Sequence, residues 1–120
     1  MSGKFCVSLT RATEDPDRAT VAFVVANAAV GSEQDTVVFL STEAVRLAVA
    51  GAADAVHEEG FLPLRELMAN FTGGGGKIWV CSPCFKKRGL DETRLVPGAT
   101  IVGGAKLVEL LASGAPCVSY

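Results

Sequence analysis

Residues 77–84, Lys-Ile-Trp-Val-Cys-Ser-Pro-Cys, decide the fold, because they join an expected strand directly to an expected helix. The stretch up to Cys81 is short, apolar and rich in aromatic and β-branched residues, which is typical of a buried strand. Ser82 is a common N-cap and Pro83 a common first helical residue, so a short helix is expected to run from there to about Arg88. The segment therefore predicts one strand–helix unit of an α/β fold.

The rest of the chain repeats this alternation. Four more short apolar segments are typical of strands, and they cover residues 4–9, 36–40, 99–102 and 116–120. The expected helices run from Pro16, capped by Asp15, to about Val30, from Ser41 or Thr42 to Ala50, from Pro63 to Phe71, and from Ala105 to Ala112. Five strands that alternate with helices predict one parallel sheet that is covered on both faces.

The composition limits the class of protein. The chain has 120 residues, 49% of them hydrophobic and 20% charged, which predicts one globular domain over residues 1–120 and excludes disorder. Its 11 Lys and Arg against 13 Asp and Glu leave no basic excess for binding nucleic acid. The longest apolar stretch, Val21–Val30, is too short to span a membrane. Because no signal-peptide pattern is present, we expect a cytoplasmic protein with reduced cysteines.

One expected helix points to an assembly of several subunits. Its segment from Val21 to Ala26 is apolar over more than one helical turn. A helix on a sheet usually keeps a polar outer stripe, whereas a helix that is apolar all round is buried on both sides. The segment therefore predicts a subunit interface, and the alternative is that its alanines and valines tolerate partial exposure.

The most informative chemistry lies at Cys81. It is expected at the carboxyl end of a strand, where open α/β sheets bind their ligands, and just before a helix. The partial positive charge of a helix N-terminus favours a thiolate over a thiol, and Lys86, Lys87 and Arg88 add positive charge nearby. These features predict a lowered pKa for Cys81 and a reactive sulfur.

Three chemistries fit a Cys-x-x-Cys pair in this place. Cys81 could carry sulfane sulfur as a persulfide, the two thiols could cycle with a disulfide, or they could form half of a zinc site. Zinc is the weakest of the three, because Cys6, Cys117 and His57 have no ligand spacing. Two inert thiols in a strand–helix turn are the remaining alternative.

Several segments together resemble the DsrE/DsrF-like family of small sulfur-relay proteins. They match in order over nearly the whole chain and comprise residues 13–19, 38–40, 63–67, 79–84, 88–89 and 98–103. The resemblance implies a three-layer α/β/α sandwich with a five-stranded parallel sheet, assembled into homo- or hetero-oligomers that are often trimers or hexamers. It implies a persulfide on one cysteine, with sulfur donor and acceptor proteins as partners and with no organic cofactor or metal.

The resemblance also places the carrier cysteine. In the family it lies eight residues before the glycine of an Arg-Gly pair, and here the matching residue is Cys81, eight residues before Gly89. Cys84 matches a second cysteine found in the YchN-like branch and absent from TusD-like members, which makes that branch the nearer one. Cys84 is either a resolving or assisting thiol or a small apolar residue of the helix.

Further site residues are expected at the same edge of the sheet. Thr10, Arg11, Thr13 and Glu14 follow the first strand, and the carboxyl ends of parallel strands meet at one edge. We expect Thr10, Arg11 and Glu14, together with Ser82 and Arg88, to bind the substrate. Helix capping and a solvated loop are the alternative for the residues that follow the first strand.

Other residues are assigned structural roles. His57 is expected in a solvated surface loop, and Cys6 and Cys117 are expected to be buried in strands. The run Gly73–Gly76 follows a helix and precedes a strand, the reverse of a phosphate-binding loop, so it is expected to be a connector. The sequence thus predicts a sulfur carrier, with two alternatives: a non-catalytic oligomer that binds a ligand or a partner, and a thiol–disulfide redox protein.

Overall fold

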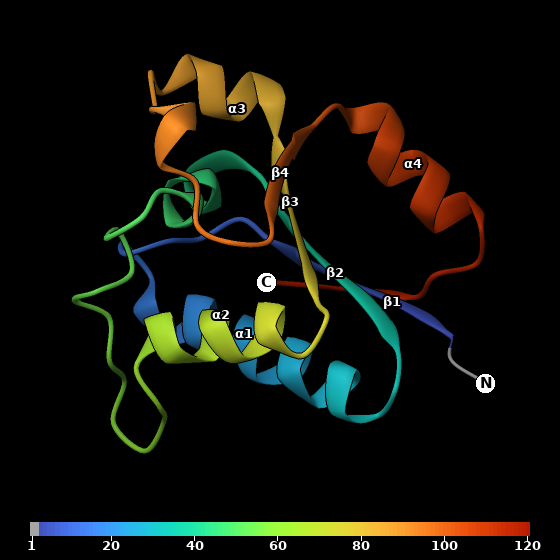
Figure 1. The fold of residues 1–120 in the computed structure, drawn as a ribbon, viewed down its shortest axis with the longest axis horizontal. Helices are drawn as coiled ribbons and strands as arrows, with labels where there is room; N and C mark the ends of the chain where they lie inside the picture. Colours follow the sequence, from blue (N-terminus) through green and yellow to red (C-terminus); the bar gives the residue numbers. More distant parts are fainter. Residues whose placement is uncertain (1–2) are drawn as a thin grey trace.

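The computed structural model describes residues 3–120 and shows one sheet of five strands in the order β4-β3-β2-β1-β5 (Figure 1). All four strand pairs are parallel. The elements are β1 (Lys4–Leu9), α1 (Pro16–Gly31), β2 (Asp35–Leu40), the 3-10 helix η1 (Thr42–Ala48), α2 (Leu64–Gly73), β3 (Lys77–Cys81), α3 (Ser82–Lys87), the 3-10 helix η2 (Glu92–Arg94), β4 (Ala99–Val102), α4 (Gly104–Ala112) and β5 (Cys117–Ser119). The predicted α/β class, the parallel sheet and the layers of helices on both faces are confirmed.

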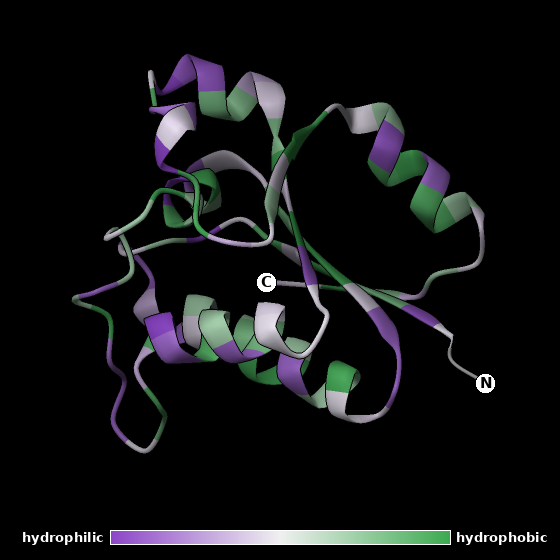
Figure 2. Cartoon of the chain, viewed as in Figure 1, coloured by the Kyte–Doolittle hydropathy of each residue, from purple (hydrophilic) through white to green (hydrophobic). Residues whose placement is uncertain are grey.

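The main core lies between the sheet and the pair α1 and α2. Apolar side chains of β1, β2 and β3 alternate toward these helices, and Figure 2 shows hydrophobic segments along both the strands and the helices. Phe23 of α1 and Phe71 of α2 are fully buried and meet edge to face, with ring centroids 5.9 Å apart. This aromatic pair joins the two helices and the sheet into one core.

The opposite face of the sheet is covered more loosely, by α4. No residue of α4 is fully buried, and Val108 is 67% exposed. Lys106 places its ammonium group 5.7 Å from the ring centre of Trp79 on β3, which joins this helix to the sheet. In residues 3–120, no helix is both long and apolar enough to cross a membrane.

Helix α1 begins and is capped as the sequence predicts. Asp15 accepts a hydrogen bond from the Arg18 backbone N–H, and Pro16 is the first helical residue. The six residues from Val21 to Ala26 are all buried or half-buried within the single chain, because α2 and the sheet pack against them. Packing within the chain covers Ala22, Phe23 and Ala26 fully and leaves Val21, Val24 and Val25 half-buried, so the subunit interface on this helix stays a prediction.

Two local predictions are wrong. The segment expected to be a helix from Ser41 or Thr42 to Ala50 is a 3-10 helix that ends at Ala48, and the side chain of Ser41 makes no capping hydrogen bond. Thr42 has a φ of 51°, which is incompatible with the first turn of an α-helix. Ser82 is the first residue of α3 and not its N-cap. The N-cap is Cys81, whose side chain makes no capping hydrogen bond.

The glycine run is the predicted connector, and it fits closely under the core. Gly74 ends α2, Gly75 has a φ of 101° that favours glycine, and Gly76 is buried. A Cβ atom on Gly76 would overlap the ring of Phe71, whereas one on Gly73 would meet nothing within 4 Å.

We therefore expect Gly76→Ala to lower the free energy of unfolding by about 1–3 kcal/mol, because the Phe71 ring has to move within a packed core. Gly73→Ala is the matched control and is expected to change it by less than ~1 kcal/mol, in the stabilising direction. Urea denaturation of both variants measures the difference. Equal effects of the two substitutions would contradict this packing.

Candidate functional site

The carboxyl ends of three neighbouring strands meet at one edge of the sheet, and the cysteine pair lies there. β3 ends at Cys81, and Cys84 lies in the first turn of α3. Thr10 follows β1, and Ser41 and Thr42 follow β2. Both cysteines carry free, half-buried thiols, so their sulfurs are partly shielded from water but not sealed from it.

Cys84 is the thiol that this environment favours as a thiolate. Burial acts to raise its pKa, but hydrogen bonds from the Thr42 backbone N–H and from the Cys81 thiol, together with the charges of Arg88 and Lys87, lower the pKa below its usual value. The strongest of the lowering influences comes from η1, a different segment of the chain, which follows β2. Cys84 is therefore the thiol of the pair whose ionised form the surroundings stabilise more.

Cys81 behaves in the opposite way, and the predicted lowering of its pKa is wrong. Burial raises the pKa of Cys81, and its side-chain hydrogen bond to Cys84 raises it further. The Cys84 backbone N–H and the charge of Arg88 act in the lowering direction and do not outweigh burial. Two neighbouring thiols cannot both ionise easily, and the opposite pKa shifts favour a proton on Cys81 over one on Cys84.

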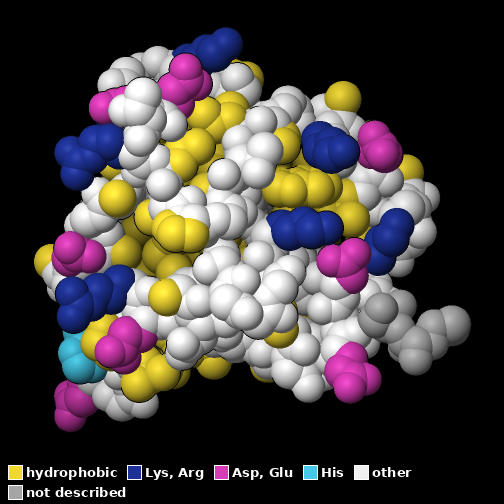
Figure 3. Space-filling model, viewed as in Figure 1, with side chains coloured by type: hydrophobic (Ala, Val, Ile, Leu, Met, Phe, Trp, Pro, Cys, Tyr) yellow, Lys and Arg dark blue, Asp and Glu magenta, His cyan; other side chains and the backbone are white. Residues whose placement is uncertain are grey.

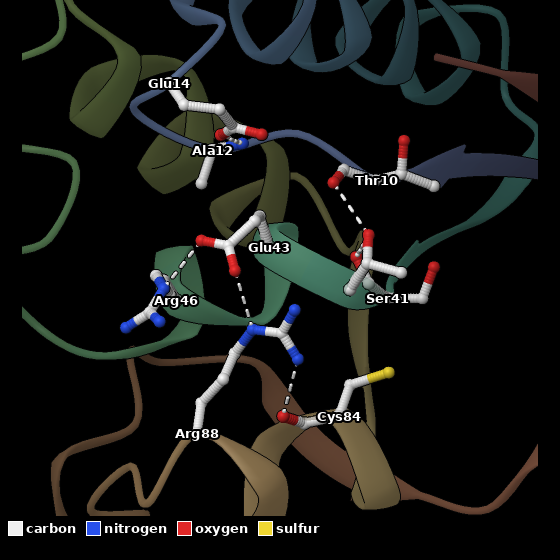
Figure 4. Close-up of polar contacts among 9 residues, drawn as sticks. Thr10, Ala12, Glu14, Ser41, Glu43, Arg46, Cys84 and Arg88 are labelled. Carbon is white, nitrogen blue, oxygen red and sulfur yellow. Dashed lines mark hydrogen bonds and ion pairs between the residues drawn. The ribbon is translucent and has the colours of Figure 1, made fainter.

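Arg88 is held in place by two partners. Its Nε lies 2.9 Å from a carboxylate oxygen of Glu43, and its Nη1 donates to the carbonyl of Cys84 over 3.2 Å. The other Glu43 oxygen accepts from Nε of Arg46 at 2.8 Å, and Figure 4 shows Glu43 between the two arginines. These hydrogen bonds from Arg46 and Arg88 hold the pKa of Glu43 below its usual value. Glu43 thus ties η1 to α3 and keeps the charge of Arg88 near Cys84.

Thr42 adopts a backbone conformation that few β-branched residues accept. Its φ of 51° lies in the left-handed region, where such a residue is strained. Its hydroxyl donates to the Thr10 carbonyl over 2.8 Å, which ties the end of β2 to the end of β1. The Thr42 backbone N–H is also the strongest of the influences that lower the pKa of Cys84.

The predicted substrate-binding residues divide into two groups. Arg88 and Thr10 join the cysteine site, the first directly and the second through Thr42. Ser82 is half-buried at the start of α3. Arg11 is exposed, and the carboxylate of Glu14 accepts the N–H of Ala12 at 2.6 Å, so Glu14 is engaged within its own loop. Their predicted role in binding stays a prediction.

Sequence reasoning missed Thr42 and Glu43. Both follow β2 as Thr10 follows β1, so they too lie at the edge where the carboxyl ends of the parallel strands meet. The sequence pattern of this segment predicts an α-helix and its cap, which gave these two residues no role in the site. Within the described residues 3–120, no group of three or more His, Cys, Asp and Glu side chains gathers around a possible metal position. His57 is exposed and hydrogen-bonds the Phe61 carbonyl at 2.9 Å.

A separate apolar cavity of about 470 Å³ lies on the face that carries α2. Figure 3 shows the hydrophobic side chains that line this hollow. Its walls come from the end of η1, from α2 and from the loop before β4, and include Leu47, Met68 and Pro97. None of the residues that surround Cys84 lines it, so the cavity and the cysteine site are distinct.

The electrostatic account of Cys84 predicts the effect of neutralising Arg88. Arg88→Gln removes a charge that lowers the Cys84 pKa, so alkylation of Cys84 by iodoacetamide at pH 7.5 is expected to slow by roughly two- to tenfold. Lys86→Gln removes the same charge from an exposed position on α3 and is expected to leave the rate within about twofold. Site-resolved mass spectrometry measures both rates. An equal loss in the two variants would mean that only the general positive charge of α3 matters.

Comparisons with known proteins place the chain in a family. A model of the DsrE/DsrF-like family matches residues 3–119. An uncharacterized protein of Methanocaldococcus jannaschii is 28% identical over 102 residues, which are 85% of this chain and 37% of that protein, so the chain spans little more than a third of that relative's length.

Solved structures share the fold over nearly the whole chain. The ychN protein of E. coli superposes with a TM-score of 0.83 at 18% identity and covers 98% of this chain and 99% of its own. A protein from Methanobacterium thermoautotrophicum superposes with a TM-score of 0.69 at 15% identity, covering 98% and 99% of the two chains. The family match and the likeness to ychN confirm the resemblance on which the sequence analysis relied. The chain belongs to the DsrE/DsrF-like family.

Proposed function

We propose that this protein carries sulfane sulfur as a persulfide at the Cys81–Cys84 site and passes it from a donor protein to an acceptor protein. The observation that carries this proposal is the unequal pair of thiols. Cys84 has a lowered pKa and Cys81 a raised one, and the two share a hydrogen bond. Membership of the DsrE/DsrF-like family supports a role in sulfur relay.

The loading step is a thiolate substitution at sulfur. The Cys84 thiolate attacks the terminal sulfur of a donor persulfide, the donor's S–S bond breaks, and the donor leaves as a thiolate that Cys81 can protonate. Cys84 then carries the persulfide. An acceptor thiolate attacks the same terminal sulfur, and Cys84 is released as a thiolate again. No net oxidation or reduction of the protein occurs in this cycle.

The proposal gives Cys81 and Cys84 different roles from those implied by the family resemblance. The resemblance points to Cys81 as the carrier, whereas the charges and hydrogen bonds favour the first attack from Cys84. Cys81 then acts as a proton donor that is held next to the leaving group. A trimeric or hexameric assembly and a cytoplasmic location both stay predictions.

A second candidate is thiol–disulfide exchange by the same pair. The spacing of the pair favours it, because Cys81 lies directly before α3 and Cys84 in its first turn, and the two thiols influence each other's pKa. In this reaction the two thiols lose two electrons and two protons to a disulfide substrate, which is reduced to two thiols. The mass of the product distinguishes the two reactions, because a persulfide adds about 32 Da to the protein and an internal disulfide removes about 2 Da.

Incubation with a small persulfide donor, followed by tryptic digestion and mass measurement of the peptides, tests the proposal. We expect the wild type to gain about 32 Da, one sulfur atom, on the peptide of residues 78–86, and Cys84→Ser to gain none. Cys81→Ser is expected to load more slowly, because it keeps the nucleophile and loses the proton donor.

Each other outcome overturns part of this account. Loading of Cys84→Ser but not of Cys81→Ser would make Cys81 the carrier. A loss of about 2 Da with no added sulfur would favour thiol–disulfide exchange. No change in any variant would leave a non-catalytic protein that binds a ligand or a partner.

A further inference from the structure

A second pair of cysteines lies on two neighbouring strands, away from the site described above. Cys6 of β1 and Cys117 of β5 are partners in the parallel register of these strands. β5 is a three-residue strand at the edge of the sheet, and β1 is its neighbour. The sequence analysis expected both cysteines to be buried, and this is wrong for Cys117, which is exposed.

The backbone spacing of this pair suits a disulfide. Neighbouring strands lie about 4.7–4.9 Å apart, and residues in register have side chains on the same face of the sheet. Bridged cysteines usually have Cα atoms about 4.4–6.8 Å apart. Cys6 and Cys117 therefore need no rearrangement of the sheet to approach one another.

The two cysteines are register partners on neighbouring strands, and only Cys117 is exposed to the solvent. Cys6 is 0% exposed, and burial, a side-chain hydrogen bond with Cys117 and the charge of Cys117 raise its pKa to about 12. Cys117 is exposed, and its thiol also lies 3.7 Å from the Val118 carbonyl. A small-molecule disulfide in solution can thus react with Cys117 first, because Cys6 is buried and inaccessible to it.

We propose that Cys6 and Cys117 form a second, reversible dithiol that closes to a cross-strand disulfide and fixes the edge strand β5 to β1. The Cys117 thiolate attacks a small-molecule disulfide, RSSR, to give a Cys117–SR mixed disulfide and release RS⁻. Cys6 then loses its proton and attacks the Cys117 sulfur, and the second RS⁻ leaves. The two cysteines are oxidised by two electrons, and RSSR is reduced to two thiols.

The bond would act on a strand that supports the site at Cys84. Beyond β5, the Tyr120 carbonyl accepts hydrogen bonds from the Thr10 N–H at 3.0 Å and from the Thr10 hydroxyl at 2.9 Å. The Thr10 carbonyl in turn accepts a hydrogen bond from the hydroxyl of Thr42, the residue whose backbone N–H lowers the pKa of Cys84. Oxidation of the Cys6–Cys117 pair would therefore fix the strand whose end binds Thr10, next to the Cys84 site.

Peptide mapping of the full-length wild type after incubation with glutathione disulfide tests the pair. Trypsin separates Cys6 (residues 5–11) and Cys117 (residues 107–120) from Cys81 and Cys84, which share residues 78–86. We expect the first two peptides to become linked, with a loss of about 2 Da, and dithiothreitol to reverse the link. The assignment of peptides distinguishes this bond from any chemistry at Cys81 and Cys84.

Cys117→Ser is the matched control, because it changes an exposed side chain and leaves the buried Cys6 in place. In this variant we expect no link and a Cys6 that stays a free thiol in the folded protein. The proposal is overturned if wild-type Cys117 keeps a stable glutathione adduct of roughly 305 Da while Cys6 remains free. It is equally overturned if neither cysteine reacts while the protein is folded.

Discussion

The junction between the turn after β2 and the helix after β3 is the contact on which the candidate site depends, because Glu43 binds Arg88 there over 2.9 Å and the Thr42 backbone N–H and the charge of Arg88 both lower the pKa of Cys84. It exists because parallel strands deliver their carboxyl ends to one edge of the sheet, so a turn after β2 can reach a helix after β3. The strained backbone of Thr42 is held there by its bond to the Thr10 carbonyl, and Glu43 anchors the same turn to Arg88. Three segments that are distant in the sequence thus set the charge of one sulfur.

The same arrangement explains why the two cysteines differ. They share a hydrogen bond, so ionising one makes ionising the other more costly, and the donors around them decide which sulfur keeps its proton. The Thr42 backbone N–H lowers the pKa of Cys84, and Arg88 contacts the carbonyl of Cys84. At Cys81 the largest influence on the pKa is burial, which raises it. A thiolate beside a neutral thiol suits the transfer of sulfur, in which a nucleophile attacks and a leaving group needs a proton.

The strands and the main helices could be predicted from the sequence because their signals are local. β1, β3 and β4 have the predicted bounds, since short apolar runs ended by polar residues or glycine have few other uses. The turn at Thr42 could not be predicted in this way, because a left-handed threonine is strained, and its hydroxyl contacts the carbonyl of Thr10, which is distant in the sequence. The order of the two cysteine pKa values was likewise hidden. The helix argument considers only residues near Cys81, and the decisive donor is contributed by η1.

The most direct measurement is a mass spectrum of the protein isolated from its own cells without reductant and alkylated at once. Our account predicts that the peptide of residues 78–86 carries one extra sulfur of about 32 Da, and that fragmentation places it on Cys84. A peptide whose two cysteines are always plain thiols or always joined to each other, under conditions that preserve persulfides, would contradict it.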